Sequence, residues 1–192
     1  MELQHINAKL LVKNSAGENL EPLIPIFHGW IKERAFGELL LDVADYRHVP
    51  AGPGVVLIGE SADYSVDDTD DRCGVRYNRK AALDGSNQDR LRQAAHSALI
   101  ACQRLEAEPS LAQKLLFNGQ EMEFFVNDRM LAPNLPATRE AVRPDFDAFL
   151  KKLFGGAEFS LSHGDDPRRL FGVSVKTSRS FSVADLLANL DA

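Results

Sequence analysis

Apolar and polar residues alternate at the start of the chain and then change to a helical spacing. Every second residue within 7–13 is apolar, which predicts a strand. The next apolar residues recur at steps of three and four: Leu20, Leu23, Ile24, Phe27, Trp30 and Ile31. This spacing predicts an amphipathic helix. Pro22 and Pro25 fit that helix only if it begins at about Pro22, because the first helical amides lack an intrahelical acceptor.

Two apolar runs follow, at residues 39–44 and 55–58. Nearly every position in them is apolar, which predicts strands that are covered on both faces. The sequence AGPG at 51–54 lies between them, and glycines around a proline favour a tight turn that needs positive φ. We therefore expect residues 39–58 to form a close antiparallel hairpin.

The middle of the chain predicts a further strand, a helix and a second hairpin. Residues 74–80 have strand character, and Ser86 with Asp89 matches a capping box that opens a helix reaching about Leu105. Its apolar residues recur at steps of three and four and form a seam, the stripe that we expect to face the core: Leu91, Ala95, Ala98, Cys102 and Leu105. Asn118-Gly119 between two apolar runs predicts a hairpin turn, and a short helix starting at Pro109 is the alternative.

The C-terminal part predicts two more helices and one more hairpin. Thr138 is expected to cap a helical region that breaks or restarts at Pro144 and ends near Phe154. Alternating apolar residues at 159–161 and 171–175 predict a hairpin with one face toward water. Ser182 repeats the capping-box pattern before a last helix at 183–190.

Together these elements indicate an α+β fold with a mainly antiparallel sheet, built of hairpins with helices packed on it. The 192 residues fit a single domain, 1–192. A helix followed by a hairpin occurs twice, about 120 residues apart, which suggests two pseudo-symmetric halves at 1–108 and 109–192. Chance similarity between two such units is the alternative to a duplication.

Composition narrows the class of protein. Hydrophobic residues at 44% and charged residues at 26% are ordinary values for a globular protein. The net charge of −6 argues against a nucleic-acid partner, which would need a basic face. The chain lacks a signal-peptide pattern and an apolar run of roughly 20 residues, so a membrane partner is not expected. Two cysteines, Cys73 and Cys102, do not make a secreted disulfide framework, and we expect a cytoplasmic protein.

Several segments together resemble a family of uncharacterised bacterial proteins. The resemblance extends over nearly the whole chain and is carried by FHGWI, LLLDVADYRHV, AGPGV, ADYSVD, VRYNRK, FNGQE and VNDR. It implies a single unit of about this length in a bacterial cytosol. No activity is assigned to that family, so the resemblance assigns no catalytic residue to this chain.

Two groups of residues are candidate ligand-binding positions. Asp45, Tyr46 and His48 follow the first apolar run, and a histidine beside a carboxylate can serve in acid–base chemistry. The alternative is that these side chains bond backbone groups and organise the turn. The second group is Tyr77, Arg79 and Lys80, where basic side chains beside an aromatic ring could receive a phosphate or a carboxylate.

A third feature is acidic. Residues 60–71 contain six acids and no base, and oxygen ligands suit calcium or magnesium. The spacing departs from the calcium-loop pattern, so a solvated acidic loop is the better interpretation. The five histidines are scattered without the spacing of a zinc site, and we predict neither a metal nor another cofactor.

These observations favour a cytoplasmic binding or accessory protein without catalytic activity, with a homodimer left open. The alternative is a small acid–base hydrolase that uses the Asp/His cluster. That enzyme requires Asp45, His48 and the residues near Tyr77–Lys80 to converge on one concave pocket.

Overall fold

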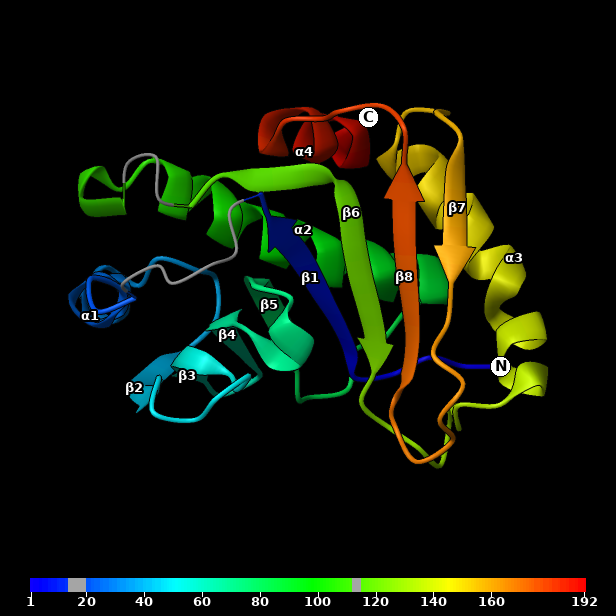
Figure 1. Ribbon diagram of the computed structural model, residues 1–192, viewed down its shortest axis with the longest axis horizontal. Helices are drawn as coiled ribbons and strands as arrows, with labels where there is room; N and C mark the ends of the chain where they lie inside the picture. Colours follow the sequence, from blue (N-terminus) through cyan, green and yellow to red (C-terminus); the bar gives the residue numbers. More distant parts are fainter. Residues whose placement is uncertain (14–19, 112–114) are drawn as a thin grey trace.

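The computed structural model describes residues 1–13, 20–111 and 115–192 and has one eight-stranded antiparallel sheet (Figure 1). The strand order is β2-β3-β4-β5-β1-β6-β8-β7. The strands are β1 (Ile6–Val12), β2 (Leu40–Tyr46), β3 (Gly54–Gly59), β4 (Ala62–Asp67), β5 (Gly74–Arg79), β6 (Phe117–Val126), β7 (Phe159–Ser162) and β8 (Phe171–Thr177). The helices are α1 (Leu23–Glu33), α2 (Asn87–Glu106), α3 (Pro136–Leu153) and α4 (Val183–Asp191), with 3-10 turns η1 (Thr69–Asp71) and η2 (Pro109–Leu111). The predicted α+β class is confirmed.

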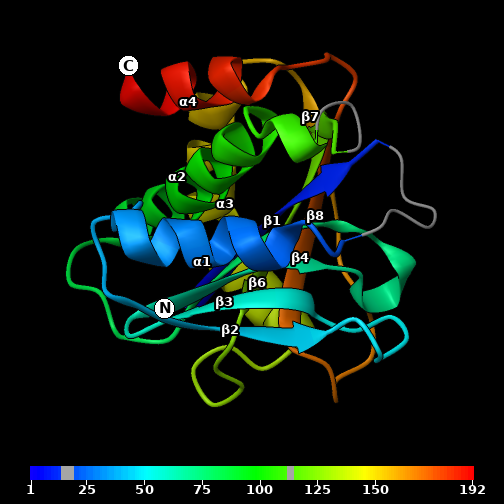
Figure 2. The ribbon, with the colours of Figure 1, turned by 90° about the vertical axis from the view of Figure 1, so that its left-hand side faces the viewer.

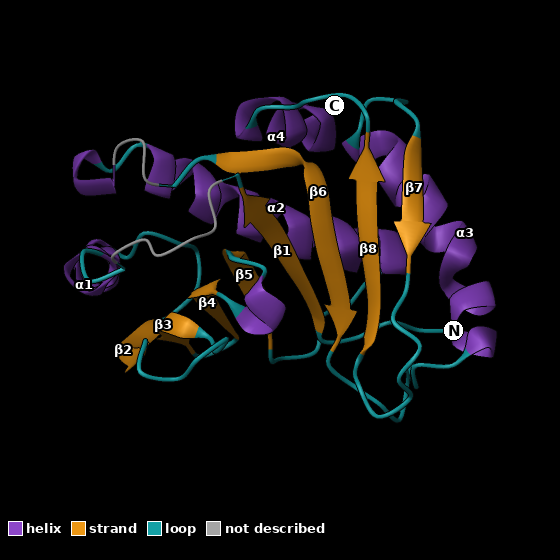
Figure 3. Cartoon of the chain, viewed as in Figure 1, coloured by secondary structure: helices purple, strands orange, loops and turns teal. Residues whose placement is uncertain are grey.

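All four helices lie on the same side of the sheet. In the view of Figure 3, α2 passes behind β1, β6 and β8, α3 lies behind and beside β7, and α4 lies at the upper edge of the sheet, while strands and loops face the reader. Figure 2 shows α1 on the helix side of β2 and β3. The rings of Trp30, Phe36, Tyr64 and Tyr77 form a continuous series from α1 to the strands under α2. The hydrophobic core therefore occupies one face of the sheet, and the other face is left to polar side chains.

Local signals account for the helix positions. Ser86 accepts from the Asp89 amide and Asp89 accepts from the Ser86 amide, so the predicted capping box is formed, and Ser182 forms the same box with Asp185. The first helix begins at Leu23, directly after Pro22, as the two prolines require. The predicted seam of α2 is buried and packs on β1 and β5.

The predicted hairpin at 39–58 is confirmed as β2 paired antiparallel with β3. Gly54 has φ of +65°, and a Cβ atom there would lie 2.1 Å from the carbonyl oxygen of Val66, so glycine is required at this position. The expectation that both strands are covered on both faces is wrong for β2. It is the edge strand, and Leu41 in β2 and Leu39 just before it are 54% and 59% exposed, so no part of the described fold covers these side chains.

The predicted hairpin at Asn118-Gly119 is also wrong. Both residues lie inside β6, which runs without a turn from Phe117 to Val126. A Cβ atom at Gly119 would lie 2.0 Å from the carbonyl oxygen of Phe181, so this glycine permits a close backbone approach instead of a turn. The alternative at Pro109 is realised as the single 3-10 turn η2.

Three smaller expectations change as well. Residues 62–67 of the expected acidic loop form strand β4, where the acids alternate with residues of the core. The third helix continues through Pro144 without a break. Its N-cap is Leu135, which makes no side-chain cap; Pro136 opens the helix, and Thr138 is buried inside it.

The two helix–hairpin units occupy different places in the sheet. The hairpin of β7 and β8 pairs directly with β6, whereas β4 and β5 separate the hairpin of β2 and β3 from β1. A duplication into halves 1–108 and 109–192 stays a prediction.

Candidate functional site

Strand register builds a row of polar side chains across the uncovered face. Lys9 of β1 pairs with Arg76 of β5 on one side and with Glu123 of β6 on the other. The row continues to Ser65 on β4 and to Ser174 on β8. Neighbours in one row project to the same face of a sheet, so five strands contribute to a single polar strip.

The deepest part of this strip is an ion pair. Lys9 Nζ lies 2.5 Å from Asp67 Oδ1, and the two side chains are 2% and 3% exposed. The Asp67 carboxylate also accepts from the amide and hydroxyl of Thr69, at 3.2 and 2.9 Å. Gly74 pairs with Asp67 on the intervening strand and has no side chain to separate Asp67 from β1. Buried charges are stable only when they are paired and hydrogen-bonded in this way.

Two loops on the uncovered face are fastened to each other. An isolated bridge joins Pro133 to Leu170, and the Asn134 side-chain amide donates to the carbonyl oxygens of Gly164 and Asp166, at 3.0 and 2.9 Å. These contacts fix residues 127–135, which follow β6, against residues 163–170 between β7 and β8. The loops thereby carry three arginines to the polar strip: Arg129, Arg168 and Arg169.

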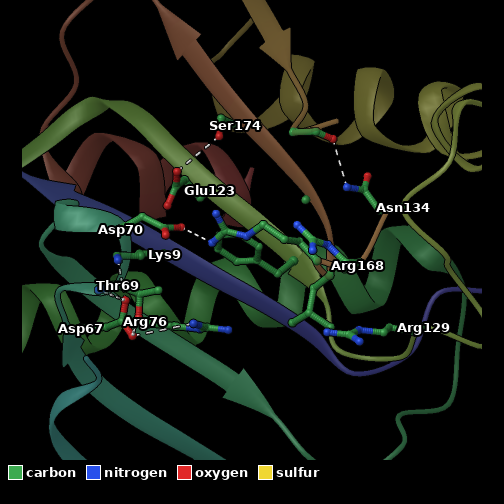
Figure 4. Close-up of a pocket in the computed structure, with 15 residues that line it drawn as sticks. Lys9, Asp67, Thr69, Asp70, Arg76, Glu123, Arg129, Asn134, Arg168 and Ser174 are labelled. Carbon is green, nitrogen blue, oxygen red and sulfur yellow. Dashed lines mark hydrogen bonds and ion pairs between the residues drawn. The ribbon is translucent and has the colours of Figure 1, made fainter. Parts of the chain in front are cut away.

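Strip and loops enclose a hollow of about 400 Å³, and Figure 4 shows the side chains that line it. Five basic side chains line it against three acidic ones. The basic residues are Lys9, Arg76, Arg129, Arg168 and Arg169, and the acidic residues are Asp67, Asp70 and Glu123. The lining is therefore net positive in a chain whose net charge is −6.

Apolar surface is also present in the hollow. Phe125 and Leu170 contribute to its wall, and the guanidinium of Arg76 lies over the Phe125 ring at 5.1 Å from its centroid. A cation placed over a ring in this manner is held by the ring quadrupole. The hollow thus combines an apolar wall with a few oriented charges, as ligand sites do.

Two arginines are held by acids at the mouth of the hollow. Arg168 donates to both oxygens of Asp166, at 3.0 and 2.9 Å. Arg169 bonds Asp70 of η1, and this contact connects loops that are 99 residues apart in the chain. Asp70 raises the pKa of Arg169, so this cation stays charged.

The negative charge of Glu123 is balanced by Arg72, which does not line the hollow. Arg72 Nε lies 2.9 Å from Glu123 Oε1 without hydrogen-bond geometry, while its NH2 group donates to Glu121 Oε1 at 2.6 Å. Ser174 Oγ lies 3.3 Å from Glu123 Oε1. Glu123 is thus bound by its own neighbours, and its charge, after that of Asp70, also helps to raise the pKa of Arg169.

The first predicted group lies elsewhere, at the exposed turn of the β2–β3 hairpin. Arg47 donates twice to the Asp45 carboxylate, at 2.8 and 2.7 Å, and lowers the pKa of Asp45 to about 2. A carboxylate with so low a pKa is a weak base near neutral pH. The rings of Tyr46 and His48 stack at 6.3 Å between centroids, and both side chains are exposed.

The second predicted group is divided between surfaces. Tyr77 is buried beneath α2, where it accepts from Gln93 Nε2 at 2.8 Å, and burial raises its pKa. Arg79 donates to the carbonyl oxygen of Ala81 at 2.8 Å. Lys80 binds Asp63 Oδ1 at 2.7 Å. Each side chain is already engaged within its own part of the fold.

The structure does not bring the two groups together. Asp45 on β2 pairs with Val55 on β3, and the same row continues through Val66 on β4 to Val75 on β5. Asp45 is therefore three strand spacings from β5. Three spacings correspond to about 14 Å, and Tyr77 and Arg79 lie further along β5. One pocket shared by both groups, which the hydrolase alternative requires, is therefore not formed, and ligand binding by either group alone stays a prediction.

The residues of the hollow were not singled out in the sequence, apart from the acids of residues 60–71. One signal for this site is present in the sequence: Lys9 lies inside an apolar strand, and a buried lysine needs a buried partner of opposite charge. Its partner Asp67 lies 58 residues away, and neither spacing nor composition pairs them. The expectation that this acidic stretch is a solvated loop is wrong for Asp67, which is 2% exposed.

The described part of the chain contains neither a metal-binding cluster nor a helix able to span a membrane. Within residues 1–13, 20–111 and 115–192, no three histidine, cysteine or acidic side chains are grouped to hold a metal ion. None of the described helices combines the length and apolar character of a membrane span. Cys73 and Cys102, both in the described part of the chain, are buried and not joined in a disulfide. Comparison with models of known protein families and with curated proteins found no match to this chain.

Proposed function

We propose that this is a small-molecule-binding protein without catalytic activity of its own, and that its ligand occupies the hollow on the uncovered face of the sheet. The observation that carries the proposal is the hollow itself, whose floor is a buried ion pair in which Asp67 accepts hydrogen bonds from Lys9 and Thr69. Its volume of about 400 Å³ lies at the lower end of the range for small-molecule sites, ~300–1,000 Å³.

The chemistry of the lining favours binding over catalysis. None of the described residues that line the hollow is a histidine or a cysteine. Asp67 accepts hydrogen bonds from Lys9 and Thr69, and Glu123 is paired with Arg72, so both carboxylates are already engaged by neighbouring side chains. A general acid or base must reach the ligand with a hydrogen bond, and carboxylates already bound by the protein are better placed to hold the lining in position.

A bacterial cytosol is the proposed compartment. Two buried cysteines without a disulfide suit a reducing environment, and the resemblance to bacterial proteins agrees with it. Membership of that family is part of the same proposal.

The test is a thermal-shift screen of metabolites and nucleotides on the wild type and on a variant with a blocked hollow. Ser174→Trp places a large ring in the hollow, and Lys176→Trp, two residues along on the same face of β8 and outside the hollow, is the matched control. A ligand that binds only the folded state raises the melting temperature. We expect shifts that Ser174→Trp abolishes and Lys176→Trp retains. An absence of shifts, or shifts equal in all three proteins, would refute the proposed site.

A homodimer is a second proposal, supported by a separate observation. The edge strand β2 carries exposed Leu41, exposed Leu39 directly precedes it, and an unpaired strand edge can pair with a second copy of itself. β3 separates this edge from β4, which supplies Asp67 to the hollow, and none of the residues that line the hollow belongs to β2.

A further inference from the structure

The cations inside the hollow are not equally neutralised. Asp67 supplies one carboxylate to two neighbours, Lys9 at 2.5 Å and Arg76 at 3.7 Å. The hydrogen bonds of Asp67 are taken by Lys9 and Thr69. Arg76 is therefore close enough to feel the charge of Asp67 but makes no hydrogen bond to it, and its Nε has no acceptor among the described residues.

Arg129 is the second cation of the hollow without a hydrogen-bond partner among the described residues, and its nearest compensation is the charge of Asp166, which itself binds Arg168. It makes neither a hydrogen bond nor an ion pair within 4.0 Å to the part of the chain that the structure describes. In Figure 4 the guanidinium groups of Arg76 and Arg129 extend toward the middle of the hollow from its two sides. Arg168 and Arg169, in contrast, have Asp166 and Asp70 as partners.

Guanidinium groups with free donors select a particular ligand chemistry. The planar fork of arginine matches two oxygens of a carboxylate or a phosphate, and such charge-assisted pairs are stronger than neutral hydrogen bonds. Arg76 is held against Phe125, so its orientation is fixed before a ligand arrives. A positive hollow on a negatively charged protein also concentrates anions at the site.

We infer, on the basis of the ligand-binding function proposed above, that the ligand is a small organic molecule with two anionic groups, carboxylate or phosphate. One group binds Arg76 and the other binds Arg129, and the carbon skeleton between them contacts Phe125 and Leu170. The volume of about 400 Å³ limits the ligand to metabolite size.

Isothermal titration calorimetry with matched probes tests the number of charges. The probes are acetate and inorganic phosphate with one anionic group each, succinate, glutarate and adipate with two carboxylates, and 3-phosphoglycerate with one of each. We expect at least one probe with two groups to bind about 10-fold or more tighter than acetate and phosphate, since each charged hydrogen-bonded pair adds to the affinity. Stronger binding of 3-phosphoglycerate than of the dicarboxylates would assign one group as phosphate, and the reverse order would assign two carboxylates. Equal binding of probes with one and two groups would overturn the inference.

Two variants test the residues. Arg76→Gln and Arg129→Gln should each lower the affinity for the best probe by about 10-fold or more. Arg143→Gln is the matched control, because Arg143 is an exposed arginine of α3 paired with Asp147. If Arg76→Gln does not fold, Arg76→Lys keeps the charge and removes the bidentate fork, and the affinity should still fall. Unchanged affinity in Arg129→Gln, or an equal loss in Arg143→Gln, would contradict the assignment.

Failure of this inference can be separated from failure of the proposed function. If the thermal-shift screen yields neutral or cationic compounds whose binding Ser174→Trp blocks, the hollow is a ligand site but the anionic class is wrong. If neither the screen nor the anionic probes bind, the ligand-binding function itself is wrong.

Discussion

Lys9 on β1 and Asp67 at the end of β4 form a buried ion pair across an intervening strand. The two charged atoms lie 2.5 Å apart, and the partners are 58 residues apart in the chain. Because β5 lies between their strands, the pair can form only when β4, β5 and β1 are all in register. The ion pair therefore connects the assembly of the sheet to the floor of the hollow.

Removing one partner of this pair should destabilise the fold strongly. Lys9→Met leaves the Asp67 carboxylate buried without its cation, and we expect a loss of about 3–5 kcal/mol in the free energy of unfolding. Urea denaturation measures this loss. Lys176→Met, at a 69% exposed side chain on the same face, should change the free energy by less than about 0.5 kcal/mol.

The double variant Lys9→Met, Asp67→Leu tests whether the two residues act as a pair. It removes both charges, so we expect it to be more stable than Lys9→Met alone. A double variant as unstable as the sum of the two single variants would show that the charges are not coupled.

Stability should fall in alkaline solution because of buried tyrosines. Burial, and then the hydrogen bond of 2.6 Å to Glu38, raise the pKa of Tyr64 far above its ordinary value of about 10. Burial raises the pKa of Tyr77 in the same direction. Above about pH 10 the unfolded chain loses these protons while the folded chain keeps them. The stability contribution is thus complete below about pH 10 and is lost as the pH rises.

Urea denaturation at about pH 8 and at several values above pH 10 measures this slope, which approaches about 1.4 kcal/mol per pH unit for each tyrosine. Tyr64→Phe should reduce the slope by up to that amount. An identical slope in the wild type and in Tyr64→Phe would mean that Tyr64 titrates alike in both states.

Two glycines should respond in opposite directions to a methyl group. Gly119→Ala places a Cβ atom 2.0 Å from the Phe181 carbonyl oxygen, and the backbone shift needed should cost about 1–3 kcal/mol. Gly29→Ala is the matched control inside α1, where a Cβ atom meets nothing within 4 Å. Alanine is the better helix former there and should stabilise by up to about 1 kcal/mol. Thermal unfolding of both variants measures the difference, and a Gly119→Ala protein as stable as the wild type would contradict the close approach.

The unpaired edge of β2 leads to a prediction about the oligomeric state of the protein. If two copies pair through this edge, Leu41→Lys should dissociate them, because a lysine on an edge strand opposes strand addition. Light scattering coupled to size-exclusion chromatography should give a dimer for the wild type and a monomer for the variant. A monomeric wild type at about 100 µM, where a typical specific dimer is formed, would exclude this role of β2.

Features that depend on neighbours along the chain were readable from the amino-acid sequence. Ser86 with Asp89, Ser182 with Asp185, the start of α1 at Pro22 and the turn at Gly54 are all short-range signals, and each was predicted where it occurs. The α+β class followed from them, because the order of hairpins and helices is itself a property of the chain.

The order of the strands in the sheet, in contrast, became clear from the three-dimensional fold alone. The apolar run of β2 predicted a covered strand, but its position at the edge leaves Leu41 in solvent. The turn signal at Gly119 was overridden by the approach of Phe181. The polar row around Lys9 depends on the registers of five strands, and the hollow above it depends on loops that meet from distant segments. Contacts of this kind are set by long-range pairing, which local propensity and spacing do not encode.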